Sequence, residues 1–354
     1  MTKLHNLFRV LLTLSLALIV GGLFIQLSGK NALIAYKVLF NSAFGSQVAL
    51  ANSLLAATPL IFTGLATVVG FRAGVFNVGV EGSLYIGAFA AAWVGFTFTK
   101  VPGPLLIFLM FTAGGLTGGL WGLFPGYLKA RLRINEIVTT IMLNYVAILL
   151  TDYLVSGPFL MEGASNAMSE KIAPQALLAR ITPKSQLNIS FFVALVVFVF
   201  VYFLLRRTTL GYEIKALGTN PIFARWSGIS VGRTIILVMV IGGVIGGVAG
   251  VAQVAGVHYR FIAGFSPGLG FTGIVVALLG RNTALGTLLA AIFFGALRNG
   301  GSTMELFTRI PRDLIEILQA LIILFVAIDL GLKWLSIRSN TNDETIESAQ
   351  SEVV

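Results

Sequence analysis

One acidic side chain stands where an apolar segment begins, in the stretch GVFNVGVEGSLYIGAFAAAW of residues 74–93. Glu81 follows Asn77 by one helical turn, and glycines surround both. We predict that a helix starts at Asn77, whose side chain would cap free backbone N–H groups. Glu81 would then lie in the first turns, where the positive end of the helix favours a carboxylate. A carboxylate within a bilayer is costly and usually serves a function.

A helix that starts inside the membrane is a broken helix, which is tolerated only against protein or a water-filled cavity. Transporters bind their substrates at such breaks. The alternative is structural, with Glu81 at the membrane interface and paired with Arg72. Asn144, alone in the apolar run TTIMLNYVAILL, would line the same path or simply form a hydrogen bond between helices.

Groups for other kinds of chemistry are scarce. The chain has no cysteine and only two histidines, His5 and His258, which argues against disulfides, thiol catalysis and Cys/His metal sites. The sequence contains no G-x-x-x-x-G-K-[ST] loop for ATP, no H-E-x-x-H and no G-x-S-x-G. We therefore expect no catalytic residues, no metal and no cofactor, and a protein that is not an enzyme.

Composition places the chain in a membrane. Of its 354 residues, 56% are hydrophobic and only 11% are charged, about half the charge of a soluble domain. The apolar residues form blocks of the length that a helix needs to cross a bilayer. The net charge of +10 indicates basic cytoplasmic loops and lipid contact rather than nucleic acid.

We predict an all-α, polytopic integral membrane protein with about ten transmembrane helices, including short or re-entrant segments. The segments 269–280 and 283–298 are short and are separated only by Arg281 and Asn282, so they form either two crossings or a re-entrant pair. The predicted segments are 8–28, 48–70, 78–98, 104–127, 137–156, 188–205, 234–256, 269–280, 283–298 and 313–332.

Basic residues gather in two loops, one at residues 129–133 and one at 206–233. An even number of crossings separates these loops, so the positive-inside rule places both in the cytoplasm, together with the N- and C-termini, in the cell (plasma or inner) membrane. The segment 157–187 would then be an external loop. The chain divides into 1–45, an N-terminal tip with the first transmembrane helix; 46–335, the transmembrane domain; and 336–354, a polar, acidic, disordered tail.

Two glycine ladders predict close helix contacts. Gly114, Gly118, Gly122 and Gly126 recur every four residues, and so do Gly242, Gly246 and Gly250. Residues at this spacing share a helix face, and missing side chains let two backbones approach closely in lipid.

A short helix is predicted in the loop 206–233. Asn220 is a good N-cap, Pro221 suits the first helical position, and Gly228 suits the end, which gives a helix over 221–227. Ile222, Phe223 and Trp226 share one face of it. Such an apolar face needs a protein partner, unless the helix packs on its own bundle or in the headgroup layer.

A second interrupted apolar stretch lies at 264–301, beginning GFSPGLGFTGIVVALLG. Together with the Glu81 segment it places one interruption in each half of the chain. Interrupted segments at corresponding positions of two halves indicate a transport site.

Two of these stretches, FRAGVFNVGVEGSLYIGAFAA and EIKALGTNPIFARWSGI, resemble the permease subunits of ABC importers of the branched-chain amino acid and simple-sugar group. The resemblance covers about residues 45–335 and is closest to the nucleoside permeases. It implies two permeases, usually different but related, two cytoplasmic ABC ATPase subunits, and an extracytoplasmic substrate-binding protein. The implied substrates are nucleosides, and the next alternatives are sugars or other small polar solutes.

The resemblance also implies residue roles. Asn77, Gly79, Glu81 and Gly82 would lie at a broken helix beside the translocation path. The region coupled to an ATPase would contain Glu213, Ala216, Gly218, Asn220, Pro221, Ala224 and Gly228, and we add the apolar face residues Phe223 and Trp226 to it. Position 83 is Ser where the family often has Gln. The alternative is a self-sufficient secondary transporter or channel, for which Glu81 is nearly the only well-placed ion ligand.

Overall fold

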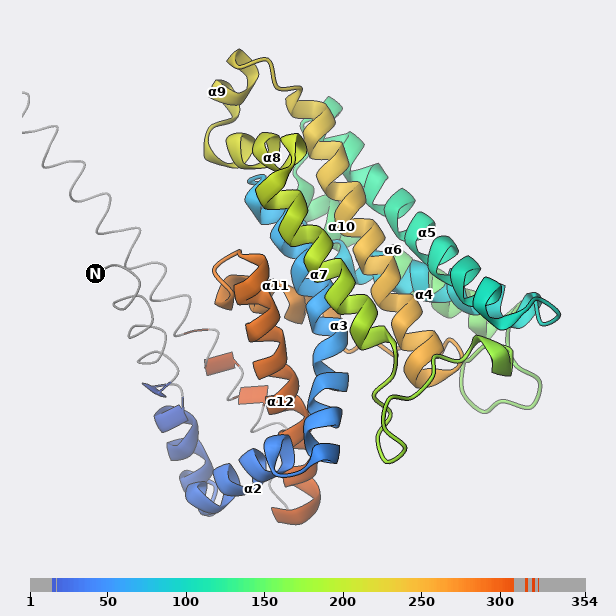
Figure 1. Cartoon of the computed structure of the whole chain (residues 1–354), viewed down its shortest axis with the longest axis vertical. Helices are drawn as coiled ribbons and strands as arrows, with labels where there is room; N and C mark the ends of the chain where they lie inside the picture. The colour runs from blue at the N-terminus through green and yellow to red at the C-terminus, as the bar shows by residue number, and fades with distance from the viewer. Residues whose placement is uncertain (1–14, 17, 309–315, 318–319, 322–323, 325–354) are drawn as a thin grey trace, which may run out of the picture. The chain divides into compact units, whose positions relative to one another are not determined.

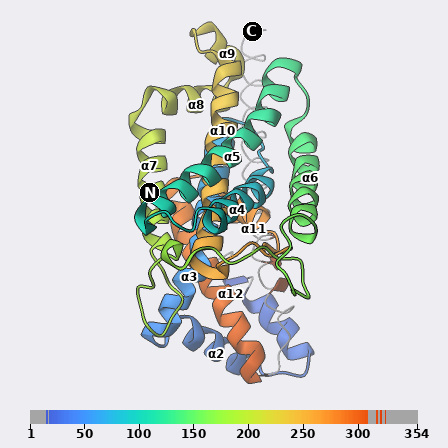
Figure 2. The same cartoon turned by 90° about the vertical axis from the view of Figure 1, so that its right-hand side faces the viewer.

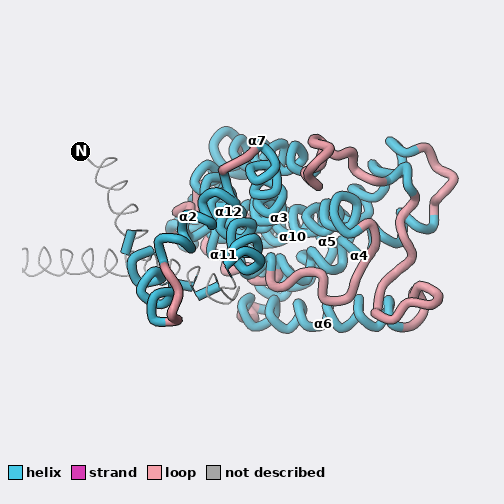
Figure 3. Tube along the Cα trace, turned by 90° about the horizontal axis from the view of Figure 1, so that it is seen from below, coloured by secondary structure: helices cyan, strands magenta, loops and turns pink. Residues whose placement is uncertain are grey.

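The computed structural model describes residues 15–16, 18–308, 316–317, 320–321 and 324. These residues form helices joined by loops and turns, without a β-strand among them (Figure 3). Six of the described helices are long and apolar enough to cross a membrane, and shorter apolar helices accompany them. The described part of the chain is therefore all-helical, and the chain is a multi-pass membrane protein. The predicted crossing at 313–332 and the acidic tail lie largely outside the described residues.

Two compact units make up the chain. The first combines residues 1–42 with 300–354. In it, a helix over Leu18–Leu27 and α2 (Ala32–Phe44) share a small buried cluster of Ile25, Ala35 and Met304. No helix was predicted at 32–44, a segment of 13 residues that includes Lys37.

The second unit, residues 43–299, holds most of the helices (Figures 1 and 2). Their bounds follow the predicted apolar segments closely, and α8 is an additional helix in the basic loop. The helices are α3 (Gln47–Arg72), α4 (Val80–Thr97), α5 (Gly103–Leu132), α6 (Glu136–Ser156), α7 (Ser190–Arg207), α8 (Thr209–Thr219), α9 (Pro221–Trp226), α10 (Val231–Gln253) with a π-helical extension (Val254–His258), α11 (Leu269–Leu279) and the part of α12 (Ala284–Thr308) up to residue 299.

Helices α5 and α10 pack through glycines, because the predicted ladder of α5 lies against Gly243 and Gly247 of α10. A Cβ atom added to Gly118 would fall 2.8 Å from Gly247 Cα, and one added to Gly122 would fall 3.4 Å from Gly243 Cα. The neighbouring face of α10 packs against α4, since a Cβ on Gly246 would meet the Val80 carbonyl oxygen at 3.1 Å. Helix α10 thus presents one glycine row to α5 and another to α4.

The two basic loops lie at the same end of this unit. A Cβ atom on Gly232 would come within 3.7 Å of Ala130 Cβ, so the loop after α5 lies beside the start of α10. We call the end with residues 129–133 and 206–233 the basic end; helices α8 and α9 lie there (Figure 1).

The segment 157–187 packs at the opposite end of the same helices, which we call the loop end. Its Leu178 N–H donates to the Ala255 carbonyl oxygen (3.0 Å), and its Ala173 N–H donates to that of Gly95 (2.9 Å). Ala255 and Gly95 lie near the C-terminal ends of α10 and α4, so the two basic loops and the 157–187 segment occupy opposite ends of these helices.

Candidate functional site

Helices α3 and α4 run in opposite directions, and a short non-helical segment connects them within the same unit. Helix α3 ends at Arg72, and Gly74 then adopts a left-handed conformation (φ 70°) that favours glycine. Gly74 touches α8 at the basic end, since its added Cβ would lie 3.4 Å from Gly218 Cα. Residues 73–79 lead from there to the start of α4 at Val80.

The start of α4 lies later than predicted. Gly79, not Asn77, occupies the N-cap position, and no side chain caps the helix from that position. The Asn77 side chain instead accepts a hydrogen bond from the Gly79 N–H (2.8 Å). Asn77 therefore satisfies a backbone donor just before the helix, in the non-helical turn that leads into it, and the predicted helix start was wrong by a few residues.

Glu81 is buried, and both of its carboxylate oxygens accept hydrogen bonds from the second half of the chain. Oε1 accepts from the Ser266 hydroxyl (2.6 Å), and Oε2 accepts from the Gly270 N–H. Gly270 lies in the first turn of α11, so Glu81 caps that helix from outside. Arg72 does not pair with Glu81; its Nε donates to the Asn282 carbonyl oxygen (2.6 Å).

Two helices therefore begin at one carboxylate. Glu81 lies in the first turn of α4 and binds the first turn of α11, and the unpaired N–H groups of a helix start favour a negative charge. Ser266 adds a second cap, since its hydroxyl also accepts from the Leu269 N–H (3.2 Å). The two interrupted segments that the sequence predicted in separate halves meet at this point.

Asn144 reaches this junction from α6. Its side-chain oxygen accepts from the Gly82 N–H (2.8 Å), and its nitrogen donates to the Val78 carbonyl oxygen (3.0 Å). The backbone before and after Gly79 is thus held by one amide. Asn144 is almost fully buried, so the interhelical hydrogen bond that the sequence left as an alternative is formed.

Neighbouring atoms leave little space for a side chain at the glycines of the junction. A Cβ atom on Gly82 would lie 2.9 Å from Asn144 Oδ1 and 3.0 Å from Trp121 Nε1, and one on Gly79 would lie 3.2 Å from Thr140 Cγ2. All five residues predicted for the substrate path, Asn77, Gly79, Glu81, Gly82 and Asn144, are buried at this junction.

The sequence did not single out Ser266, Gly270 or Trp121. Ser266 lies in the quoted stretch GFSPGLG, where a hydroxyl just before a glycine-rich helix start was the available signal. The Ser266 carbonyl oxygen also accepts from the Tyr85 hydroxyl (3.1 Å). Trp121 Nε1 is buried and has no hydrogen-bond partner among the described residues.

Helix α9 agrees with its prediction. The Asn220 side chain accepts from the N–H groups of Ile222 (2.9 Å) and Phe223 (3.0 Å), the helix spans Pro221–Trp226, and Gly228 follows it with φ 81°. Its apolar side chains are exposed to an unusual degree, 86% for Trp226, 70% for Ile222 and 59% for Phe223.

Helix α8 connects α9 to the rest of the unit. A Cβ atom on Gly218 would lie 3.0 Å from the Arg72 carbonyl carbon and 3.1 Å from Gly74 N. The Thr234 hydroxyl of α10 donates to Glu213 (3.1 Å), and the Asn220 N–H donates to the Ala216 carbonyl oxygen (3.0 Å). Of the residues predicted for coupling, Ala224 is buried, whereas Pro221, Phe223, Trp226 and Gly228 are exposed.

Comparison with known proteins agrees with this architecture. Residues 49–327 match the family described as "Branched-chain amino acid transport system / permease component". The guanosine ABC transporter permease protein NupP of Bacillus subtilis (strain 168) is 37% identical over 338 residues, 94% of this chain and 96% of its own length.

Two further relatives cover most of the chain. The glucose ABC transporter permease protein TsgB13 of Haloferax volcanii is 37% identical over 327 residues (89% of this chain, 85% of its own). The nucleoside ABC transporter permease protein NupB of Lactococcus lactis subsp. cremoris is 33% identical over 336 residues (92% of each chain). No solved structure matches the chain. The chain belongs to the family of branched-chain amino acid transport system permease components, which are transport subunits rather than enzymes.

Proposed function

We propose that this chain is the transmembrane subunit of an ATP-driven importer and forms the translocation path for nucleosides or related small sugars. The observation that carries the proposal is the meeting of α4 and α11 at Glu81, which is the arrangement of discontinuous helices found at transport sites. The names of the relatives, which include guanosine, nucleoside and glucose permeases, support the substrate class.

The proposed path runs along the junction. The wall of the path would consist of Asn77, Gly79, Glu81, Gly82 and Asn144. The hydrogen bonds that Glu81 and Asn144 form within the protein would hold the path closed. Opening would require the start of α4 to leave Asn144 or the start of α11 to leave Glu81. Transport in this scheme alternates between two packings of these half-helices, each a discrete arrangement.

Helix α9 would be the element that contacts the ATPase subunit and couples it to the transport path. Phe223 and Trp226 provide an exposed apolar face for helix-in-groove docking, and Asn220 with Pro221 fixes the direction of the helix. From there, Gly218 of α8 touches the backbone of Arg72 and Gly74. The segment 73–79 leads directly to Glu81, so a displacement of α8 and α9 has a short, contiguous route to the junction.

A second contact carries the same displacement to another helix. Glu213 of α8 binds Thr234 near the start of α10, and α10 packs by its glycines against α4 and α5. Ala216 accepts the hydrogen bond that joins α8 to Asn220, and the buried Ala224 packs α9 on the unit. Gly228 ends α9 and directs the chain toward α10.

The remaining parts of the proposal concern assembly and orientation. The basic end would face the cytoplasm, with both termini, because Lys and Arg mark cytoplasmic loops, and 157–187 would face outward toward an extracytoplasmic substrate-binding protein. Residues 46–335 would form the permease domain, with about ten crossings in the full chain. A second, related or identical permease would complete the pore, and ABC ATPase subunits would supply the energy.

Reconstitution tests whether transport through this chain requires a separate ATPase subunit. The chain is placed in proteoliposomes alone, or with its partner permease, ATPase and binding protein, and uptake of labelled guanosine is measured with and without ATP. We expect accumulation only with the complete set and ATP. Uphill accumulation by the chain alone would instead establish a self-sufficient secondary transporter.

Substrate class is tested on the binding protein. Its affinity for guanosine, adenosine, uridine, ribose and glucose is measured by calorimetry. We expect the nucleosides to bind more tightly than either sugar. Binding of ribose or glucose alone would replace nucleosides by sugars in the proposal and leave the permease assignment intact.

A further inference from the structure

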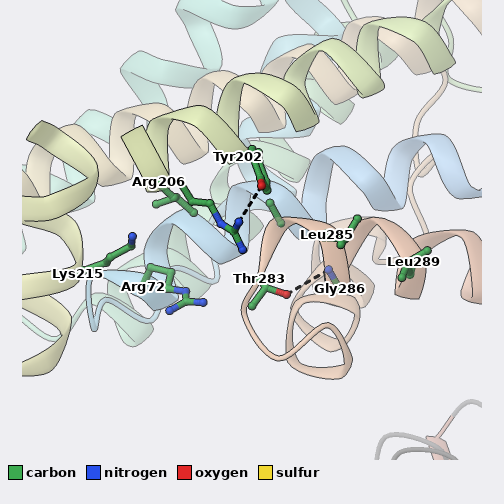
Figure 4. Close-up of a pocket in the computed structure, with 10 residues that line it drawn as sticks. Arg72, Tyr202, Arg206, Lys215, Thr283, Leu285, Gly286 and Leu289 are labelled. Carbon is green, nitrogen blue, oxygen red and sulfur yellow. Dashed lines mark hydrogen bonds between the residues drawn. The ribbon is translucent and has the colours of Figure 1, made fainter. Parts of the chain in front are cut away.

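A pocket of about 540 Å³ opens at the basic end, away from the Glu81 junction. It is lined by the C-terminal ends of α3 and α7, by α8, and by the first residues of α12 (Figure 4). All of the lining residues belong to the unit of residues 43–299.

Three cationic side chains from three helices line this pocket, Arg72, Arg206 and Lys215, and its described lining contains no Asp or Glu. The two guanidinium groups are held in position. Arg206 Nη1 donates to the Tyr202 hydroxyl (2.7 Å), with Cζ 4.6 Å from the centre of the Tyr202 ring, and Arg72 Nε donates to the Asn282 carbonyl oxygen. Cations that share one volume without a counter-charge repel one another, so the pocket favours an anion.

The start of α12 also favours an anion in this pocket. Thr283 caps the helix by accepting a hydrogen bond from the Gly286 N–H (3.1 Å), and Figure 4 shows both residues beside the pocket. The N-terminal end of a long helix carries partial positive charge and binds phosphate groups well.

The rest of the pocket wall is apolar. Leu285 and Leu289 lie one turn apart on α12, are 54% and 60% exposed, and line the pocket together with the buried Leu205. These leucines would add no binding energy for a free inorganic anion, which has no apolar surface to bury. A molecule with an anionic group at one end and a hydrocarbon chain at the other would bind both the cationic side chains and the leucines.

We propose that this pocket binds the phosphate group of an anionic phospholipid, with an acyl chain lying along Leu285 and Leu289. Arg72, Arg206 and Lys215 bind the phosphate oxygens, since guanidinium groups match phosphate geometry and the Lys ammonium adds a point charge. Basic pockets between membrane helices at the cytoplasmic surface recognise anionic lipid headgroups in this way.

Lipid retention by the purified full-length chain tests this site. The protein is extracted from nanodiscs of phosphatidylcholine with a minor fraction of phosphatidylglycerol, and the lipids bound to it are counted by mass spectrometry. We expect phosphatidylglycerol to be enriched over its share of the bilayer. Arg206→Gln and Lys215→Gln should each reduce the enrichment about fivefold.

The matched control is Arg207→Gln, which removes the same charge from the adjacent residue of α7 that does not line the pocket. Its phosphatidylglycerol enrichment should stay at the wild-type level. An equal reduction in Arg207→Gln, or no enrichment in the wild type, would overturn the proposal. Each variant is compared by size-exclusion chromatography, so that a misfolded sample is recognised.

A competition experiment separates the two sources of phosphate and needs no variant. Labelled phosphatidylglycerol bound to the wild type is titrated with short-chain phosphatidylglycerol, glycerol 3-phosphate or inorganic phosphate. Displacement by the short-chain lipid at far lower concentration supports the lipid site. Equal displacement by inorganic phosphate overturns the lipid assignment and makes this a site for soluble phosphate. Neither experiment measures transport, so both results are independent of the importer proposal.

Discussion

Glu81 and Ser266 lie 185 residues apart in the chain and are joined by a 2.6 Å hydrogen bond from the serine hydroxyl to the carboxylate. This bond connects the first turn of α4 to the residues that start α11. From it, α4 runs to Gly95 at the loop end, where the Gly95 carbonyl oxygen binds Ala173. Helix α11 runs the opposite way, to the turn whose Asn282 binds Arg72 at the basic end. Two helices of opposite direction thus meet at one carboxylate, which lies in the first turn of α4 and caps α11.

Replacing Glu81 tests whether this cap holds the junction together. Glu81→Gln keeps the size of the side chain but leaves one oxygen where two accept now, so a buried donor loses its partner. Such a loss costs about 1–3 kcal/mol. We expect a lower melting temperature in detergent and a loss of uptake by the complete transporter, with Ser266→Ala showing a smaller effect in the same direction.

The control for this charge change is Glu162→Gln, at an exposed position in the 157–187 segment. It should leave both melting temperature and uptake unchanged. Wild-type stability and uptake in Glu81→Gln would show that the carboxylate is not needed at the junction.

Gly82→Ala tests the space at the start of α4. The added methyl group would lie 2.9 Å from Asn144 Oδ1 and 3.0 Å from Trp121 Nε1, so either the hydrogen bond to Asn144 or the position of the indole must change. Overpacking of this kind costs about 1–3 kcal/mol. We expect reduced uptake and a lower melting temperature.

Gly115→Ala is the matched substitution, because Gly115 is also a buried helical glycine but its added Cβ would find the nearest atoms at an ordinary 3.6 Å. Alanine is the better helix former by about 0.5–1 kcal/mol. Gly115→Ala should therefore be neutral or stabilising, and a comparable loss in both variants would argue against a specific role for Gly82.

The cap and the exposed face of α9 are tested together. Asn220→Ala removes the acceptor for two N–H groups and costs about 1 kcal/mol of local helix stability. Trp226→Ala removes the most exposed aromatic ring of α9. We expect the double variant to reach the membrane in normal amounts and to lose ATP-dependent uptake and ATPase association.

Phe192→Ala serves as control, since this ring is 53% exposed on α7 and far along the chain from α9. Its uptake and its co-purification with the ATPase should match the wild type. Normal uptake in the Asn220→Ala, Trp226→Ala double variant would remove α9 as the coupling element.

Gly218→Ala tests the link between α8 and the segment 73–79. Its new methyl group would press on backbone atoms, 3.0 Å from the Arg72 carbonyl carbon and 3.1 Å from Gly74 N, which cannot rotate away. We expect uptake to fall while ATPase binding, measured by co-purification, is retained. Gly232→Ala, whose added Cβ has its nearest atom at 3.7 Å, should transport normally; loss of ATPase binding in Gly218→Ala would show a docking defect instead.

Local patterns in the sequence predicted the short helix α9 well. Asn220, Pro221 and Gly228 each act on their own neighbours, and the cap, the start and the end of the helix follow from residue type alone. The apolar segments predicted the long helices equally well, because length and hydropathy together identify a helix that can cross a membrane. Helix α8 was missed since its residues, TLGYEIKALGT, mix polar groups and glycines that are typical of a loop.

The partners of Glu81 could not be predicted from one sequence. Glu81 and Gly270 meet through the packing of α4 and α11, and nothing within either segment specifies the other. The start of α4 at Val80 rather than Asn77 has the same origin, because Asn144 of α6 binds the Val78 carbonyl oxygen and the Gly82 N–H. Tertiary hydrogen bonds thereby decide where the helix begins.

The glycine contact between α5 and α10 limits how this protein can move. Gly118 and Gly122 lie against the main chain of Met239, Gly243 and Gly247, so few side chains are available there to change rotamer and accommodate sliding. Closely packed surfaces rearrange between discrete arrangements rather than deforming continuously. The α5–α10 pair should therefore travel as a single rigid body, and spin labels on these two helices should keep a constant separation throughout the transport cycle while labels on α4 and α11 change theirs.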